Sequence, residues 1–442
     1  MKDSRRSAER ADIIPAPMTK GRVLFASLIG TTIEFFDFYI YGTAAVLVFP
    51  YLFFPPDNPR TATLQSLATF ALAFVARPVG SALFGHFGDR TGRKATHVAA
   101  LLTMGLSTVA IGLLPTYAAV GIAAPALLAL CRFGQGVGLG GEWGGAVLLA
   151  TENAPRGKES WYGMFPQLGA PLGFFCSTGI FVVLTAALSA DELLAWGWRI
   201  PFLASAALVG VGLWVRLTLT ETPAFQRAVE RAERVRVPIL TVVRDHTRTL
   251  ILATLAAVTT FVVFYVMTVF TLNWGTTELG FARQDFLELQ MIGVLSFALT
   301  IPLTAAAADR VGRWPILIGS SVAAILFGLT FAPLFGSGDK VTTLVFLSVG
   351  LALMGCTYGA LGSALAELFP TAVRYTGASL TFNLAGILGG SFAPYIASDL
   401  AASHGIAYVG YYVSAAAAVP LAAQLLINRR LGPHPASGRS AA

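Results

Sequence analysis

Two long apolar stretches of the chain flank the run Gly85-His86-Phe87-Gly88-Asp89-Arg90-Thr91-Gly92-Arg93-Lys94. A shorter copy, Asp309-Arg310-Val311-Gly312-Arg313, lies near the other end and repeats Asp, Arg, Gly and Arg in the same order. Glycines and opposite charges squeezed between hydrophobic helices predict a tight turn at a membrane surface. In such a turn the Asp can face a neighbouring helix end, while the basic side chains stay in the headgroup layer.

The composition also indicates a membrane protein. Of the 442 residues, 55% are apolar and 12% are charged, whereas a soluble domain carries roughly 25% charge. A membrane span needs about 20 apolar residues, and helices are the default because lipid cannot satisfy backbone polar groups. Twelve apolar runs predict an all-α integral membrane protein: residues 23–50, 64–84, 95–114, 119–150, 161–188, 199–219, 249–273, 287–307, 315–335, 341–365, 377–402 and 406–427.

An internal repeat divides these runs into two pseudo-symmetric six-helix bundles. Asp89 matches Asp309, and the run 152–155 (Glu-Asn-Ala-Pro) matches 367–370 (Glu-Leu-Phe-Pro) at nearly the same offset. We expect a bundle at 1–220 after a tail at 1–22, a linker at 221–248, and a second bundle with its tail at 249–442. Apolar residues at helical spacing predict an amphipathic surface helix in the linker: Phe225, Ala228, Val229, Ala232 and Val235.

The Lys and Arg residues predict the orientation. Most lie in the tails and in the loops on the same side as the tails, whereas the opposite loops hold Arg60, Arg199, Arg283 and Lys340. Both termini are therefore expected in the cytoplasm. The net charge of +7 gathers at one membrane face, which favours lipid rather than nucleic acid as the partner.

Charged residues inside spans are costly and are functional candidates. The chain has five, all in the first half: Glu34, Asp37, Arg77, Arg132 and Glu142. Depth along the helices suggests two layers, with Glu34 or Asp37 paired with Arg132 near the centre and Glu142 with Arg77 lower down. Two carboxylates one turn apart are not expected both to stay charged, so Glu34 and Asp37 are the candidates for proton coupling. The alternative is a salt-bridge network that only fixes helix packing.

Arg132 is the candidate substrate anchor, because its planar fork suits a carboxylate. Other polar residues are further candidates for the substrate path: Tyr41, Gln135, Gln167, Tyr265, Asn273, Tyr358 and Asn383. The glycines between Gly134 and Gly141 lie inside a span, so they predict a close-packing surface rather than a nucleotide loop. No pattern in the chain predicts a metal site or another cofactor.

The GxxxDRxGRK run with its partial copy resembles the signature loop of the major facilitator superfamily. The resemblance implies two halves that rock about a central site. The charged residues of the two loops, with the buried pair, are the candidates for a gating charge network: Arg77, Asp89, Arg90, Arg93, Glu142, Asp309, Arg310 and Arg313. The chain further resembles the metabolite:proton symporter family, which includes carriers for shikimate, α-ketoglutarate, citrate and proline/betaine. The matching runs are 33–39, 76–78, 85–94, 132–145, 196–202, 221–225 and 367–377. Similar chains form a bacterial branch of inner-membrane metabolite transporters.

The sequence thus predicts a proton-coupled symporter that imports a small organic acid or related metabolite and works as a monomer. A proton-antiport exporter of a metabolite or drug is the alternative, because Gly169-Ala170-Pro171-Leu172-Gly173 partly resembles an antiporter motif. An enzyme is disfavoured, since the chain has no HExxH, no GxSxG and no Cys/His cluster.

Overall fold

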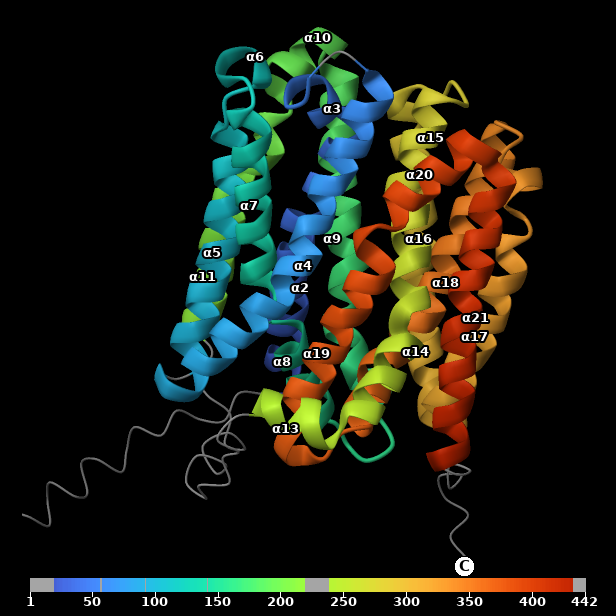
Figure 1. Cartoon of the computed structure of the whole chain (residues 1–442). Coiled ribbons are helices and arrows are strands. Elements are labelled where there is room, and N and C mark those ends of the chain that lie inside the picture. The colour runs from blue at the N-terminus through green and yellow to red at the C-terminus, as the bar shows by residue number, and fades with distance from the viewer. Residues whose placement is uncertain (1–19, 56–57, 92, 141, 219–237, 432–442) are drawn as a thin grey trace, which may run out of the picture.

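The computed structural model describes residues 20–55, 58–91, 93–140, 142–218 and 238–431, and the regular elements in these ranges are all helical. Figure 1 shows two groups of helices side by side, one blue to green and the other yellow to red. We call the end with α13 (Pro238–Asp245) the lower end and the end with α10 (Ala190–Glu192) the upper end.

The first half holds six of the twelve predicted runs. Its long helices are α2 (Lys20–Leu47), α4 (Pro59–Thr91), α5 (Arg93–Leu113), α7 (Ala123–Leu139) with α8 (Trp143–Glu152), α9 (Glu159–Ala187) and α11 (Arg199–Thr218). Short elements join them at the upper end: α3 (Phe49–Leu52), α6 (Tyr117–Val120), and α10 with the π-turn η1 (Leu193–Gly197).

The second half holds the other six runs, and two of them are interrupted by π-turns. Helix α14 (Thr247–Tyr265) passes through η2 (Val266–Phe270) into α15 (Thr271–Thr277), and α19 (Arg374–Gly386) passes through η5 (Ile387–Ser391) into α20 (Ala393–His404). The remaining elements are α16 (Arg283–Val311), α17 (Arg313–Gly328) with η3 (Phe331–Phe335), α18 (Lys340–Glu367), η4 (Thr371–Val373) and α21 (Ile406–Leu431).

Eight described helices are long and apolar enough to cross a membrane, and the bent pair Ala190–Gly197 and Arg199–Val215 adds a ninth. In each of the other three predicted runs, the described apolar helices are shorter than the 18 residues of a candidate span. These are Val98–Leu113, Arg313–Gly328, and the pair α7 and α8 on either side of residue 141. The prediction of an all-α membrane protein built from twelve helical runs is confirmed.

Helices α4 and α7 cross with their backbones in contact. A Cβ atom on Gly80 would lie 1.9 Å from the Val137 carbonyl oxygen, and one on Gly136 would lie 2.2 Å from that of Ala73. On Gly140 it would lie 2.0 Å from the carbonyl oxygen of Arg77. Only glycine permits such an approach, so the predicted close-packing surface is confirmed. The crossing holds the helices of Arg77 and Arg132 together.

Contacts between the halves come mainly from α9, which packs on α16 and α18, and from α4 and α8, which pack on α19. The predicted linker helix at 225–235 lies outside the described residues, and the proposed domain boundaries stay a prediction. The side chains of Asp89, Arg90 and Arg93 also lie outside the described part of the structure. Helix α4 ends at Thr91 and α5 begins at Arg93, and the predicted tight turn between them stays a prediction.

Candidate functional site

The buried charges lie in one half of the molecule. Among the described residues, five charged side chains are buried, and each is at most 5% exposed: Glu34, Asp37, Arg77, Arg132 and Glu142. All belong to the first half, as the sequence predicted. Burial of a charge is costly unless the structure compensates for it, so the partners of these groups decide what the site can do.

Arg132 on α7 is enclosed by aromatic rings. Its guanidinium carbon lies 4.1 Å from the ring centroids of both Phe38 and Tyr41, and 4.9 Å from that of Phe70. Nη1 donates a hydrogen bond to Oε1 of Gln135 at 3.0 Å, while Nε and Nη2 have no hydrogen-bond partner. The ring faces stabilise the cation and leave two nitrogens, Nε and Nη2, able to donate to an anion.

Asp37 on α2 faces the interior of the first half. Ser205 Oγ on α11 donates to Asp37 Oδ1 at 2.6 Å, and Oδ2 has no hydrogen-bond partner. Gln135 links this group to Arg132, because its Nε2 contacts the backbone oxygen of Asp37 at 3.4 Å and the hydroxyl of Thr108 at 2.8 Å. The predicted pairing of Asp37 with Arg132 is therefore wrong. Equal depth does not place the groups face to face, and aromatic rings cover the guanidinium instead.

Arg77 on α4 shares a ring with Arg132. Its guanidinium carbon lies 4.6 Å from the ring centroids of Phe38 and Phe74. Tyr265 of the second half packs edge-on against Phe74 at 5.2 Å between centroids, so Arg77 lies where the halves meet. The pairing of Glu142 with Arg77, and that of Glu34 with Arg132, stay predictions.

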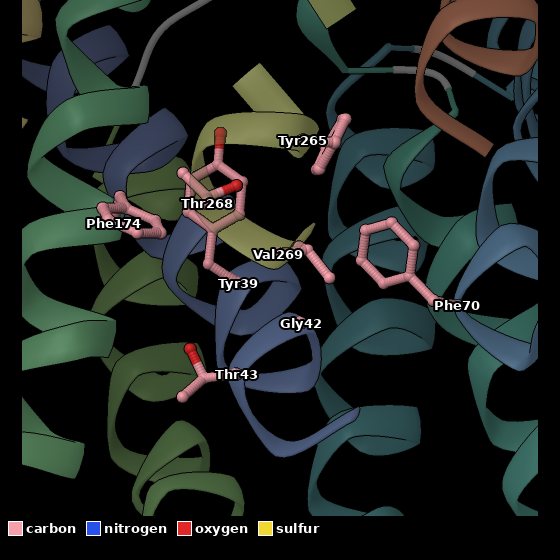
Figure 2. Close-up of a pocket in the computed structure, with 8 residues that line it drawn as sticks. All are labelled: Tyr39, Gly42, Thr43, Phe70, Phe174, Tyr265, Thr268 and Val269. Carbon is pink, nitrogen blue, oxygen red and sulfur yellow. The ribbon is translucent and has the colours of Figure 1, made fainter. Parts of the chain in front are cut away.

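A small cavity lies between the halves (Figure 2). Its volume of about 10 Å³ is near the space that one water molecule needs. It is lined from α2, α4, α9 and the α14–η2 segment by Tyr39, Gly42, Thr43, Phe70, Phe174, Tyr265, Thr268 and Val269. Phe70 also packs on Arg132. The cavity is therefore bordered by both halves and separated from the buried arginine by a single ring.

Of the eight predicted substrate residues, Tyr265 lines this cavity. Others hold helices together: the Tyr41 hydroxyl bonds Thr69 at 2.8 Å, and Asn273 bonds Ser398 at 3.4 Å. Sequence reasoning missed the other seven lining residues, because a Thr, Phe or Val in a span has the same pattern whether it packs or lines a cavity. The π-turn η2 carries two of these lining residues, Thr268 and Val269. The spacing of apolar residues in the sequence does not reveal a π-turn, so these residues could not be predicted.

The lower side of the cavity is closed by contacts between the halves. Trp143 on α8 stacks on Phe382 of α19 with centroids 3.6 Å apart. The Trp143 Nε1 donates to Gln167 at 2.8 Å, and Gln167 donates to the carbonyl oxygen of Tyr358 on α18 at 3.0 Å. Asn383 donates to Ser81 Oγ at 2.8 Å and to the Gly140 carbonyl oxygen at 3.0 Å. Gln167, Tyr358 and Asn383 thus lie in this closure.

Below that closure, the Asp309 carboxylate accepts the backbone N–H groups of Ser160 and Trp161 at 2.8 and 2.9 Å. Arg313 pairs with Glu159 at 3.3 Å and also with Glu367, while Arg310 is exposed at the end of α16. At the upper end, Arg60 of α4 pairs with Asp399 of α20 at 3.1 Å. Ion pairs or hydrogen bonds thus join the two halves at both ends of their interface in this conformation.

Two helical halves that meet around a central site are the architecture of a class of membrane transporters. The chain matches the family described as sugar (and other) transporters over residues 23–244. It belongs to this family and to the major facilitator superfamily, whose members are transporters rather than enzymes.

Relatives agree with this assignment. The chain is 54% identical to the inner membrane metabolite transport protein YhjE of Escherichia coli K12, over 93% of this chain and 94% of that one. It is 36% identical to the Escherichia coli K12 shikimate transporter, over 86% and 87% of the two chains. The D-xylose-proton symporter superposes with a TM-score of 0.70 at 16% identity, over 92% of this chain and 96% of that one. That likeness shows the shared fold.

Proposed function

We propose that this chain is a proton-coupled symporter that imports a small organic acid or related metabolite across a bacterial inner membrane. In this proposal it works as a monomer by alternating access, with the lower end of Figure 1 and both termini in the cytoplasm. The excess of Lys and Arg in the loops at that end supports the orientation.

The observation that carries the proposal is the arrangement of Asp37, Gln135 and Arg132. Asp37 is fully buried, and one of its oxygens has no hydrogen-bond partner. A buried carboxylate in this state is costly, whereas a protonated carboxyl is tolerated. The site can thus hold one proton without disturbing the packing around it. Glu34, three residues earlier and 4% exposed, is the second candidate for the same role.

Arg132 supports an anionic or zwitterionic solute. Two of its nitrogens, Nε and Nη2, have no hydrogen-bond partner, and the Phe70 ring that packs on the guanidinium also lines the cavity. Displacement of that ring would open the guanidinium to a carboxylate in the cavity. Capture of an anion by Arg132 would move Gln135, which also contacts the backbone of Asp37. Binding of the solute and of the proton would then be linked through one amide. The relatives named for shikimate and for proline/betaine agree with such solutes.

Uptake into proteoliposomes with an imposed pH gradient tests the proposal, with shikimate and glycine betaine as the first probes. We expect accumulation that requires the gradient. Asp37→Asn should lose accumulation but keep solute exchange at equal pH, because an amide cannot release a proton. Asp285→Asn, at an exposed carboxylate of the other half, is the matched control and should behave as the parent. Equal uptake with and without the gradient would reject symport, and proton-driven loss of preloaded solute would support the export alternative.

A further inference from the structure

The wall of the cavity in the second half is built from the π-turn η2. Helix α14 is regular up to Tyr265, and Val266–Phe270 then form the wider turn before α15 begins. Thr268 and Val269 of this turn line the cavity beside Tyr265 (Figure 2). A π-turn inserts one extra residue into a helix and disturbs the regular backbone bonding, so it needs partners elsewhere.

Gln290 of α16 supplies those partners. Its side chain is 1% exposed, and its Nε2 donates to the carbonyl oxygens of Thr268 at 2.7 Å and Met267 at 3.2 Å. The hydroxyl of Thr271 also donates to Met267 O at 2.6 Å. Carbonyl groups in a membrane must be satisfied by the protein. The amide of Gln290 therefore stabilises the turn through the carbonyl groups of two of its five residues.

Gln290 does not line the cavity, so it acts on the cavity through the turn. We propose that Gln290 is a positioning residue that holds η2 in its π-turn and thereby sets where Thr268 and Val269 stand in the cavity. This inference rests on the proposed function in one respect, because it treats the cavity as part of the solute path.

A second buried glutamine provides a matched control. Gln424 of α21 is also 1% exposed, and its Nε2 donates to the carbonyl oxygen of Ala256 at 2.9 Å. Ala256 belongs to the regular part of the same helix, α14. Gln290→Met and Gln424→Met therefore both remove amide-to-carbonyl hydrogen bonds from the segment formed by α14 and η2, but only the first removes them at the π-turn.

The test measures the rate at which a small methanethiosulfonate reagent labels Val269→Cys, in purified protein whose three native cysteines have been replaced. No solute and no proton gradient are needed, so its outcome is independent of whether the proposed symport is correct. With Gln290→Met we expect η2 to relax toward regular helix, which would turn Val269 by about 100° out of the cavity. Labelling should slow by about tenfold, because the local equilibrium loses both hydrogen bonds that the Gln290 amide donates. Gln424→Met should leave the rate within about twofold of the parent.

Gln290→Glu keeps the side-chain length and provides a rescue. The neutral acid at about pH 5 can donate to Thr268 O, whereas the carboxylate at about pH 9 cannot. The double variant Gln290→Glu with Val269→Cys is compared with Val269→Cys alone at the same pH. Its labelling rate should equal that of Val269→Cys alone at about pH 5 and should be lower at about pH 9. The proposal is overturned if Gln290→Met labels like the parent or if Gln424→Met slows labelling equally. If Gln290→Met does not fold, the ratio of labelling rates with and without Gln290→Glu decides instead, and a ratio that does not change with pH overturns the proposal.

Discussion

The contact of Asp309 with the start of α9 should hold the lower end closed, and Asp309→Asn tests this role. The carboxylate accepts two backbone N–H groups, from Ser160 and Trp161, at 2.8 and 2.9 Å. Asp309 belongs to one half and α9 to the other, so these bonds exist only when the lower ends of the halves meet. They also place a negative charge at a helix N-terminus, where it is favourable.

The expected effect of Asp309→Asn depends on which hydrogen bonds the asparagine side chain can still accept. Asparagine at this position can still accept one N–H through its oxygen, but it loses the second acceptor and the charge. One charge-assisted hydrogen bond at a partly buried helix N-terminus is worth about 2 kcal/mol. The ratio of closed to open forms at the lower end should then fall about 30-fold.

Pulsed electron–electron spin resonance measures this ratio as a distance distribution. Spin labels at Arg156→Cys and Arg429→Cys, both exposed and one in each half, should show a larger long-distance population with Asp309→Asn. Asp339→Asn is the matched control, since Asp339 accepts the N–H groups of Val341 and Thr342 at 3.0 Å each at the start of α18, within one half. An unchanged distribution with Asp309→Asn, or an equal change with Asp339→Asn, would refute the reasoning.

Three further predictions concern single residues. Arg132→Lys should lower the rate of gradient-driven uptake by at least about tenfold, because an ammonium cannot both stack between two rings and present a planar fork; normal uptake would remove Arg132 from the site. Trp143→Ala should loosen the lower closure about tenfold through loss of the stack on Phe382, seen as faster labelling of cysteines placed in the cavity, whereas Trp143→Phe keeps a ring on Phe382, loses only the bond to Gln167 and should loosen it less. The pKa of Asp339 lies below its ordinary value of 3.8, chiefly because the backbone N–H of Thr342 donates to its carboxylate. Its contribution to stability is therefore complete above that value and lost as the pH falls through the folded pKa, so the melting temperature of Asp339→Asn should fall less steeply in acid than that of the parent.

The sequence was sufficient to predict the features that depend on the residues of a single helix. Apolar runs of the right length predict the helices, because backbone polar groups in lipid leave no other solution. The glycines of α7 predict a close crossing, and the structure places Gly136 and Gly140 against α4. The five buried charges were also predictable, because a charge inside an apolar run is either buried in protein or extremely costly.

Features that depend on the rotation of one helix against another could not be predicted in the same way. Depth along a helix gives the layer of a charge but not the direction it faces, so Asp37 was one of the two carboxylates predicted to pair with Arg132, although it contacts Ser205. The aromatic enclosure of Arg132 was missed for a related reason. Phe38 and Phe70 have the pattern of ordinary packing residues, and only the helix arrangement brings them onto the guanidinium.

The backbone contact between α4 and α7 has a consequence for inhibitors. Because no side chain separates these helices at Gly80, Gly136 and Gly140, the spacing between the Arg77 and Arg132 guanidiniums should stay constant through the transport cycle. A compound that recognises only this pair would bind every conformation alike and trap none of them, since equal affinity shifts no population. Selectivity for one conformation would have to come from groups that reach Thr268 or Val269, on the wall with the π-turn.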